Sequence, residues 1–239
     1  MNSFALCDLD SSQWDQTMWL GLTKDVELRA VALIYFGPGW TFVNVVGEKP
    51  AGRDLLAQAV DILPRKFHLS LEAELHEQVC IEGRTLEHVQ DFKRMVPGNS
   101  SGEDHSPLAS IVRLSAADAR RIRSLLIERG ANPSAWFQEH TAASGLYRGW
   151  IENGELAGVV GVHGWSEEQK IAVVGNLGVM PRMRRNGIGR ILMETILDEL
   201  CARRWDVAFN VRVDNHPALA LYARMGCREV GIVREYRVS

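Results

Sequence analysis

Apolar residues recur at two spacings in the second half of the chain, and the two spacings predict different elements. In residues 188–204 an apolar side chain recurs at every fourth position, as on one face of an α-helix. In residues 205–213 apolar and polar positions alternate, as in a strand with one buried face. Residues 170–180 form an apolar run that Gly175 and Gly178 interrupt, which predicts a strand closely approached by another backbone or a ligand.

Capping and turn residues predict the other elements of this half. Ser115 followed by Asp118 three positions later is a signature of a helix start. The Asn-Gly pair at 153–154 is typical of a two-residue hairpin turn. The pattern closes with a helix over residues 215–226, which has a proline in its first turn and a glycine at its end, and with a strand in residues 231–238.

The first half of the chain has weaker patterns. Residues 27–47 predict two strands joined by a Gly-Pro-Gly turn. Residues 52–67 have the apolar spacing of a short helix that Pro64 closes. Residues 68–79 and 87–96 are ambiguous between helix and strand, so this half is expected to be mixed α and β.

One stretch has the composition of a linker. Residues 97–107 contain no large apolar side chain and several turn-forming residues. They divide the chain into an N-terminal α/β domain of residues 1–96 and a larger domain of residues 108–239. The fold class predicted for the whole chain is α/β (α+β).

Composition narrows the classes of partner. The net charge is −3, so a nucleic-acid partner, which usually requires a basic excess, is not expected. The longest apolar run, residues 30–36, is too short to span a membrane, and the first residues do not read as a secretion signal. The four cysteines lie far apart, without the spacing of a zinc site. We therefore expect a cytoplasmic protein with no membrane partner and no metal; the sequence does not indicate its oligomeric state.

A short turn between the strand of residues 170–180 and the following helix concentrates positive charge. It consists of Arg184, Arg185, Asn186, Gly187, Ile188 and Gly189. A helix start leaves backbone N–H groups unpaired and carries about half a positive elementary charge, so it attracts anions. The two glycines let a ligand approach the backbone, and the asparagine tolerates a left-handed conformation. With two arginines beside it, the turn is suited to a pyrophosphate.

Two other anion-binding patterns do not match this turn. A P-loop requires a Lys-Ser or Lys-Thr pair after its second glycine, and none follows here. A dinucleotide fingerprint requires a third glycine at the position of Leu192. A basic turn that binds nothing stays a simple alternative, because glycine-rich turns before helices are common.

Residues 111–238 resemble the GNAT superfamily of acyl-CoA-dependent N-acyltransferases. The resemblance depends on Val-x-Pro at 179–181, Arg-x-x-Gly-x-Gly at 184–189, and the spacing N-x-x-A-x-x-x-Y-x-x-x-G over 215–226. It implies a mixed, mostly antiparallel sheet flanked by helices, preceded by a smaller half that is a degenerate copy of the same fold. Residues 145–165 are also similar to a bacterial subgroup akin to glycine N-acyltransferases.

The resemblance implies direct transfer of an acetyl or longer acyl group from acyl-CoA, here acetyl-CoA, to an amine of a small molecule or amino acid. Tyr222 would be the general acid that protonates the departing thiolate, or a core residue on an apolar helical stripe. Asn215 would contact the cofactor or only cap its helix. The cofactor-binding residues implied are Leu177, Gly178, Val179, Arg184, Arg185, Asn186, Gly187, Ile188, Gly189, Arg190 and Asn215.

The chain departs from this family in two places. Many relatives have a carboxylate as general base where this chain has Asn176, and His163 is a rival base. Relatives usually have an aromatic residue where this chain has Cys227, so the packing around Tyr222 is expected to differ. Without an evident base, we expect an acceptor with a weakly basic amine; a non-catalytic acyl-CoA sensor is the alternative function.

Overall fold

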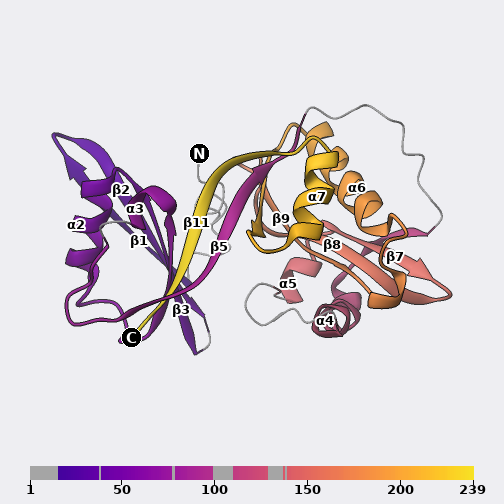
Figure 1. Cartoon of the computed structure of the whole chain (residues 1–239), viewed down its shortest axis with the longest axis horizontal. Helices are drawn as coiled ribbons and strands as arrows, with labels where there is room; N and C mark the ends of the chain where they lie inside the picture. The colour runs from indigo at the N-terminus through magenta and orange to yellow at the C-terminus, as the bar shows by residue number, and fades with distance from the viewer. Residues whose placement is uncertain (1–15, 38, 77–78, 99–109, 129–136, 138) are drawn as a thin grey trace. The chain divides into compact units, whose positions relative to one another are not determined.

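The backbone forms two compact units. The computed structural model describes residues 16–37, 39–76, 79–98, 110–128, 137 and 139–239. The first unit comprises Met1–Met95, Asn210–Leu219 and Glu229–Ser239, and the second comprises Val96–Phe209 and Ala220–Arg228. The expected linker, residues 97–107, lies outside the described residues except for its first two positions. Figure 1 shows the trace of the whole chain.

The second unit is built on a mostly antiparallel sheet. The strand order is β10-β9-β8-β7-β6, in which only the β10–β9 pair is parallel. Its strands are β6 (Ile111–Leu114), β7 (Tyr147–Glu152), β8 (Glu155–Ser166), β9 (Ile171–Val179) and β10 (Asp206–Arg212). Its helices are η2 (Ala116–Asp118), α4 (Ala119–Glu128), α5 (Glu139–Ala142), η3 (Pro181–Met183), α6 (Ile188–Ala202) and α7 (His216–Arg224), whose first turn belongs to the first unit.

Helices cover both faces of this sheet. On one face, α6 lies so close that a Cβ on Gly158 would be 2.9 Å from Leu192 Cδ1. On the other face, Val159 packs in one apolar cluster with Ile122 and Leu125 of α4. Because neighbouring residues of a strand point to opposite faces, α6 and α4 lie on opposite sides of β8 (Figure 1).

The capping and turn signals of this unit are confirmed. The Ser115 backbone N–H donates to Asp118 Oδ2 at 3.0 Å, and the Asp118 N–H donates to the Ser115 carbonyl at 3.0 Å. Asn153 and Gly154 both have positive φ, 49° and 81°, between β7 and β8. Such a pair of angles is that of a type I′ turn, whose twist matches an antiparallel hairpin.

The first unit also has a mixed sheet, with the order β1-β2-β3-β4-β11-β5. Its strands are β1 (Thr17–Lys24), β2 (Glu27–Gly37), β3 (Trp40–Gly47), β4 (Phe67–Glu72), β5 (Leu86–Val96) and β11 (Arg228–Val238). Its helices are α2 (Lys49–Ala59) and the short α3 (Ala73–His76). Leu55 and Leu56 of α2 pack on apolar side chains of the sheet and form the core of this unit.

Several expectations for the first half are refined. Residues 68–79 fall mostly in strand β4 followed by α3, and residues 87–96 form a strand. The helix expected to reach Pro64 ends at Ala59, and the chain continues as a turn in which the amides of Ile62 and Leu63 both bond to the Ala59 carbonyl. Strand β1, which the apolar pattern did not indicate, pairs with β2.

The two units share one order of elements. In each, three strands form an antiparallel meander, a helix follows, and the next strand pairs in parallel with the third strand of the meander. The elements are β1-β2-β3-α2-β4 in the first unit and β7-β8-β9-α6-β10 in the second. This repeat supports the interpretation of the first half as a degenerate copy of the second.

Candidate active site

The arginine- and glycine-rich turn follows directly from β9. The strand ends at Val179, η3 makes one turn, and α6 begins at Ile188 with Gly187 as its N-cap. Gly187 has φ 79°, a left-handed conformation that favours glycine. We expected Asn186 to tolerate such a conformation, but Arg185 takes it instead, with φ 70°.

The start of α6 has the properties of an anion site. The first backbone hydrogen bond of the helix runs from the Ile191 N–H to the Gly187 carbonyl at 3.0 Å. The N–H groups of the first turn therefore precede the helical ladder and point out of its end. Because Gly187 has no side chain, it cannot cap these groups as a serine or aspartate would, which favours an anionic ligand there.

Gly189 leaves space that the fold itself does not require. A Cβ on Gly189 would lie 3.6 Å from Val179 Cγ2, an ordinary van der Waals contact, and its φ is not in the left-handed region. Neither packing nor backbone conformation in the described part of the chain therefore explains a glycine here. A ligand that approaches the backbone would explain it, so acyl-CoA fits this turn, and its binding here stays a prediction.

The arginines of this region differ in their partners. Arg184 and Arg185 are exposed, and Arg184 Nε donates to the Val179 carbonyl at 3.2 Å, which holds that side chain against the end of β9. Arg190 Nε donates to Glu194 Oε1 at 2.6 Å. Arg190 is thus partly neutralised by an i,i+4 partner, and the turn itself carries the stronger positive field.

A β-bulge lies in β9 just before the turn. Gly178 pairs with Val159 and Gly175 pairs with Gly161, so Asn176 and Leu177 together oppose a single residue of β8. Asn176 has φ 54°. The parallel ladder of β9 with β10 covers only Ile171–Val173, so residues 174–179 lie beyond it. This stretch carries Leu177, Gly178 and Val179, the backbone expected to contact an extended ligand.

Tyr222 is the buried residue of α7. Its ring centroid lies 4.7 Å from that of Phe209 on β10, at an interplanar angle of 60°. The Cys227 N–H donates to the Tyr222 carbonyl at 2.9 Å and closes the helix. Phe209 thus supplies aromatic packing beside Tyr222 in a chain that has cysteine at position 227. The role of Tyr222 as general acid stays a prediction.

Asn215 caps α7. Its Oδ1 accepts a hydrogen bond from the Ala218 N–H at 3.3 Å, three residues into the helix. Of the two roles that the sequence left open, the structure thus contains the cap, and contact with the cofactor stays a prediction.

His163 is not placed as a solvent-facing base. Both of its ring nitrogens are buried, and a Cβ on Gly175 would lie 2.4 Å from its Cε1, so the imidazole covers that glycine. Burial lowers the pKa of His163 to about 4, because an imidazolium loses its hydration there. The close approach predicted at Gly175 is therefore made by this ring.

Tyr147 contacts the bulge and Thr141 contacts Tyr147, and the sequence pattern indicated neither residue. Asn176 Nδ2 donates to the Tyr147 hydroxyl oxygen at 2.8 Å, and that oxygen lies 3.2 Å from Thr141 Oγ1. Tyr147 is fully buried, and burial raises the pKa of its phenol. The glycine of β8 opposite Tyr147, Gly161, is the feature that could have indicated a ring lying across the sheet.

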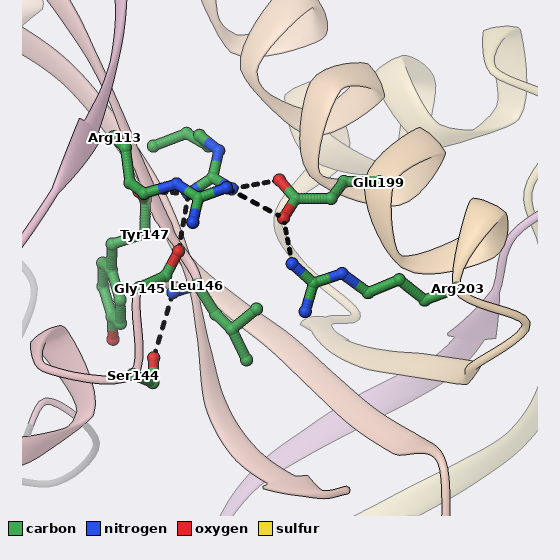
Figure 2. Close-up of polar contacts among 8 residues, drawn as sticks. Arg113, Ser144, Gly145, Leu146, Tyr147, Glu199 and Arg203 are labelled. Atoms are coloured by element: carbon green, nitrogen blue, oxygen red, sulfur yellow. Dashed lines mark hydrogen bonds and ion pairs between the residues drawn. The ribbon is translucent and has the colours of Figure 1, made fainter.

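A buried arginine fixes the start of β7. Arg148 Nη1 donates to the carbonyls of Gly145 and Tyr147 at 2.8 and 2.7 Å, and Nη2 pairs with Glu199 of α6. Figure 2 shows that Glu199 also faces Arg113 and Arg203. Arg203 Nη2 donates a hydrogen bond to Glu199 Oε1 at 2.7 Å. Burial lowers the pKa of Arg148, and Glu199 opposes that effect. These contacts tie the backbone of Tyr147 to α6.

The described residues include no helix that is long and apolar enough to cross a membrane. Within the same residues, no three His, Cys, Asp or Glu side chains lie close enough together to hold a metal ion.

Comparison with known proteins identifies similar chains. The acetyltransferase (GNAT) family matches residues 116–227. The N-alpha-acetyltransferase RimI of Mycobacterium tuberculosis is 34% identical over 137 residues, which cover 54% of this chain and 85% of RimI. The ribosomal protein bS18-alanine N-acetyltransferase of Escherichia coli K12 is 33% identical over 119 residues, which cover 46% of this chain and 76% of that enzyme.

Similarity of fold extends over both units. The solved structure of a tandem GNAT protein from the clavulanic acid biosynthesis pathway superimposes with a TM-score of 0.59 and 14% identity, covering 100% of this chain and 87% of that protein. At this identity the likeness concerns the fold alone. The expected similarity to glycine N-acyltransferases stays a prediction.

Proposed function

This chain belongs to the acetyltransferase (GNAT) family of acyl-CoA-dependent N-acetyltransferases, and from that premise we propose that its acceptor is an α-amino group. The carrying observation is that, among the described residues, the bulge of β9 has no ionisable base: Asn176 stands where many relatives have a carboxylate, and the ring nitrogens of His163 are buried, which lowers its pKa to about 4. The acceptor amine must therefore lose its proton with little help. This restricts the reaction to amines of low pKa.

The pKa of the amine decides which acceptors are accessible. A lysine ammonium near pKa 10.4 needs about 4.6 kcal/mol to lose its proton at pH 7, whereas an α-ammonium near 7.8 needs about 1 kcal/mol. Two relatives are named as an N-alpha-acetyltransferase and an alanine N-acetyltransferase, which supports an α-amino acceptor. Those names favour a peptide N-terminus over the small-molecule amine that the sequence suggested, and the same site chemistry serves both.

Each group of the site has one task in this proposal. The turn of residues 184–189 holds the pyrophosphate of acetyl-CoA, and the backbone of residues 177–179 holds its pantetheine arm. The neutral amine attacks the thioester carbonyl carbon, so a C–N bond forms and the C–S bond breaks. The Tyr222 hydroxyl gives its proton to the departing thiolate, and water takes the surplus proton of the amine. The catalytic relatives favour this enzyme over the acyl-CoA sensor, and we place the reaction in the cytoplasm.

Competition among amines tests the acceptor. At pH 7 with saturating acetyl-CoA, thiol release is measured for alanine, a short peptide with a free N-terminus, and Nα-blocked lysine. We expect kcat/KM for the peptide N-terminus to exceed that for the blocked lysine by about 10²–10³, the ratio of their neutral fractions. A preference for the lysine side chain contradicts the proposal. The peptide and the free amino acid together decide whether a protein or a small molecule is the acceptor.

The same assay tests Tyr222. Tyr222→Phe keeps the ring that packs on Phe209 and removes the hydroxyl. We expect kcat to fall about 10²–10⁴-fold, the range for a placed general acid, with little change in the affinity for acetyl-CoA. Full activity in this variant would assign Tyr222 to the core alone.

A further inference from the structure

The bulge of β9 contains a backbone conformation that its own residue does not favour. Asn176 has φ 54°, in the left-handed region, within a strand whose other residues are extended. Asparagine tolerates this region better than most residues but, unlike glycine, still prefers negative φ. A contact with the Asn176 side chain from outside the strand can therefore help to select this conformation.

The Asn176 side chain is held by a tyrosine two strands away. Its Nδ2 donates to the Tyr147 hydroxyl oxygen at 2.8 Å, and that oxygen lies 3.2 Å from Thr141 Oγ1. Since the phenol oxygen accepts the amide hydrogen, its own hydrogen is available to Thr141. Tyr147 and Thr141 are both buried and Asn176 is half-buried, which limits the access of water to the phenol oxygen.

The tyrosine reaches the bulge because the strand between lacks a side chain. Gly161 of β8 pairs with Tyr147 on one side and with Gly175 on the other. A Cβ on Gly161 would lie 2.2 Å from Tyr147 Cε1, so any other residue there would displace the ring. The Tyr147 ring therefore lies across β8 and carries its hydroxyl to β9.

Both ends of this tyrosine are fixed. The Arg148 guanidinium donates a hydrogen bond to the Tyr147 carbonyl and pairs with Glu199 of α6. The Phe137 ring meets the Tyr147 ring edge to face, with centroids 5.9 Å apart. Tyr147 thus has one position, from which its hydroxyl can determine the conformation of Asn176.

We propose that Tyr147 is a positioning residue that holds the β9 bulge, through Asn176, in the shape that receives the acyl thioester. The inference rests on the proposed function, because residues 177–179, which directly follow Asn176, are the backbone assigned to the pantetheine arm. If Asn176 relaxed to negative φ, the peptide planes on either side of it would turn, and the amide and carbonyl groups of this stretch would leave their positions. Tyr147 itself does not contact the reacting atoms.

A double-mutant cycle with glycine at position 176 tests this role. Tyr147→Phe removes the hydroxyl and keeps the buried ring. We expect it to lower kcat/KM for acetyl-CoA at least about tenfold, the equivalent of one lost hydrogen bond, because the backbone that holds the pantetheine arm changes position. In the Asn176→Gly background the same substitution should have no further effect, because glycine takes positive φ without assistance. Equal losses in both backgrounds, or no loss in either, overturn the proposal.

A readout without turnover separates this inference from the proposed function. Backbone amide exchange at Leu177 and Gly178 should accelerate in Tyr147→Phe and return toward the wild-type rate when Asn176→Gly is added. Tyr35→Phe, which removes a hydroxyl bonded to Gln16 in the first unit, is the matched control and should leave both amides unchanged. Unchanged exchange in Tyr147→Phe overturns the inference. If exchange is restored in the double variant but no amine is acetylated, the result supports the positioning role of Tyr147 and contradicts the proposed reaction.

Discussion

Glycines of β8 and β9 make room for two aromatic side chains of the neighbouring strands. The Tyr147 ring lies over Gly161 and the His163 ring lies over Gly175. The sequence pattern indicated a close approach at Gly175, but it did not distinguish a ligand from a ring of the same protein. A glycine inside a strand indicates that the space of a side chain is free for another group, and only the packed structure identifies that group.

The burial of His163 predicts a dependence of stability on pH. Its pKa is about 4 in the folded chain and near 6.5 when unfolded, so the unfolded chain binds the proton first as the pH falls. His163 therefore contributes on the order of 3 kcal/mol to the free energy of unfolding above pH 6.5, and this contribution is lost as the pH falls to about 4. Urea unfolding of the wild type and His163→Gln between pH 4 and 8 measures it.

The comparison of the two proteins isolates the histidine from other groups. Burial raises the pKa of Glu235 to about 7. The effect of this carboxyl on the free energy of unfolding therefore has the opposite pH dependence: it is present below pH 4.5 and is lost as the pH rises through 7. Because Glu235 is common to both proteins, the difference between their curves belongs to His163. Parallel curves would mean that the pKa of His163 does not change on folding, which would contradict its burial as a neutral imidazole.

At the scale of elements, strong periodicity and capping chemistry were sufficient for prediction. The helix expected over residues 188–204 is α6, and the strand expected over residues 205–213 is β10. Residues 68–79 could not be assigned, because a short buried strand and a helical turn have similar apolar runs and only tertiary packing distinguishes them. The order of strands depends on pairing between distant segments, which local patterns do not report.

The N-cap of α6 gives a prediction at this scale. Gly187 and Gly154 have nearly the same φ, 79° and 81°, and a Cβ on either would meet no atom within 4 Å. Replacement of either by alanine should therefore destabilise the protein by a similar amount, roughly 1–2 kcal/mol, through backbone strain alone. Thermal unfolding with and without acetyl-CoA measures both effects.

The ligand should distinguish these two glycines. Acetyl-CoA should raise the melting temperature of the wild type and Gly154→Ala by the same amount, and that of Gly187→Ala by less, because only Gly187 opens the proposed pyrophosphate site. Equal ligand-induced shifts of the melting temperature in all three proteins would mean that the start of α6 does not bind the pyrophosphate.

At the scale of the whole molecule, one chain carries two units with the same order of elements and different chemistry. The turn that follows β9 has two arginines and two glycines, whereas in the first unit a single residue, the N-cap Glu48, separates β3 from α2. An acidic N-cap of that kind does not suit a phosphate. The sequence could indicate which half carries the site, because the charged turn is local, but the repeat became visible only from strand pairing.

The proposed function depends on binding of the diphosphate of acetyl-CoA by the turn at the start of α6. Calorimetric titration of acetyl-CoA into the wild type and Gly189→Ala tests it, because a Cβ at position 189 makes only an ordinary contact with Val179 within the protein but would occupy part of the proposed ligand site. We expect one molecule bound per chain, and affinity at least about tenfold weaker in the variant, or 1.4 kcal/mol, with unchanged melting without ligand. Equal affinity in the two proteins, or no binding to the wild type at millimolar acetyl-CoA, would contradict the account.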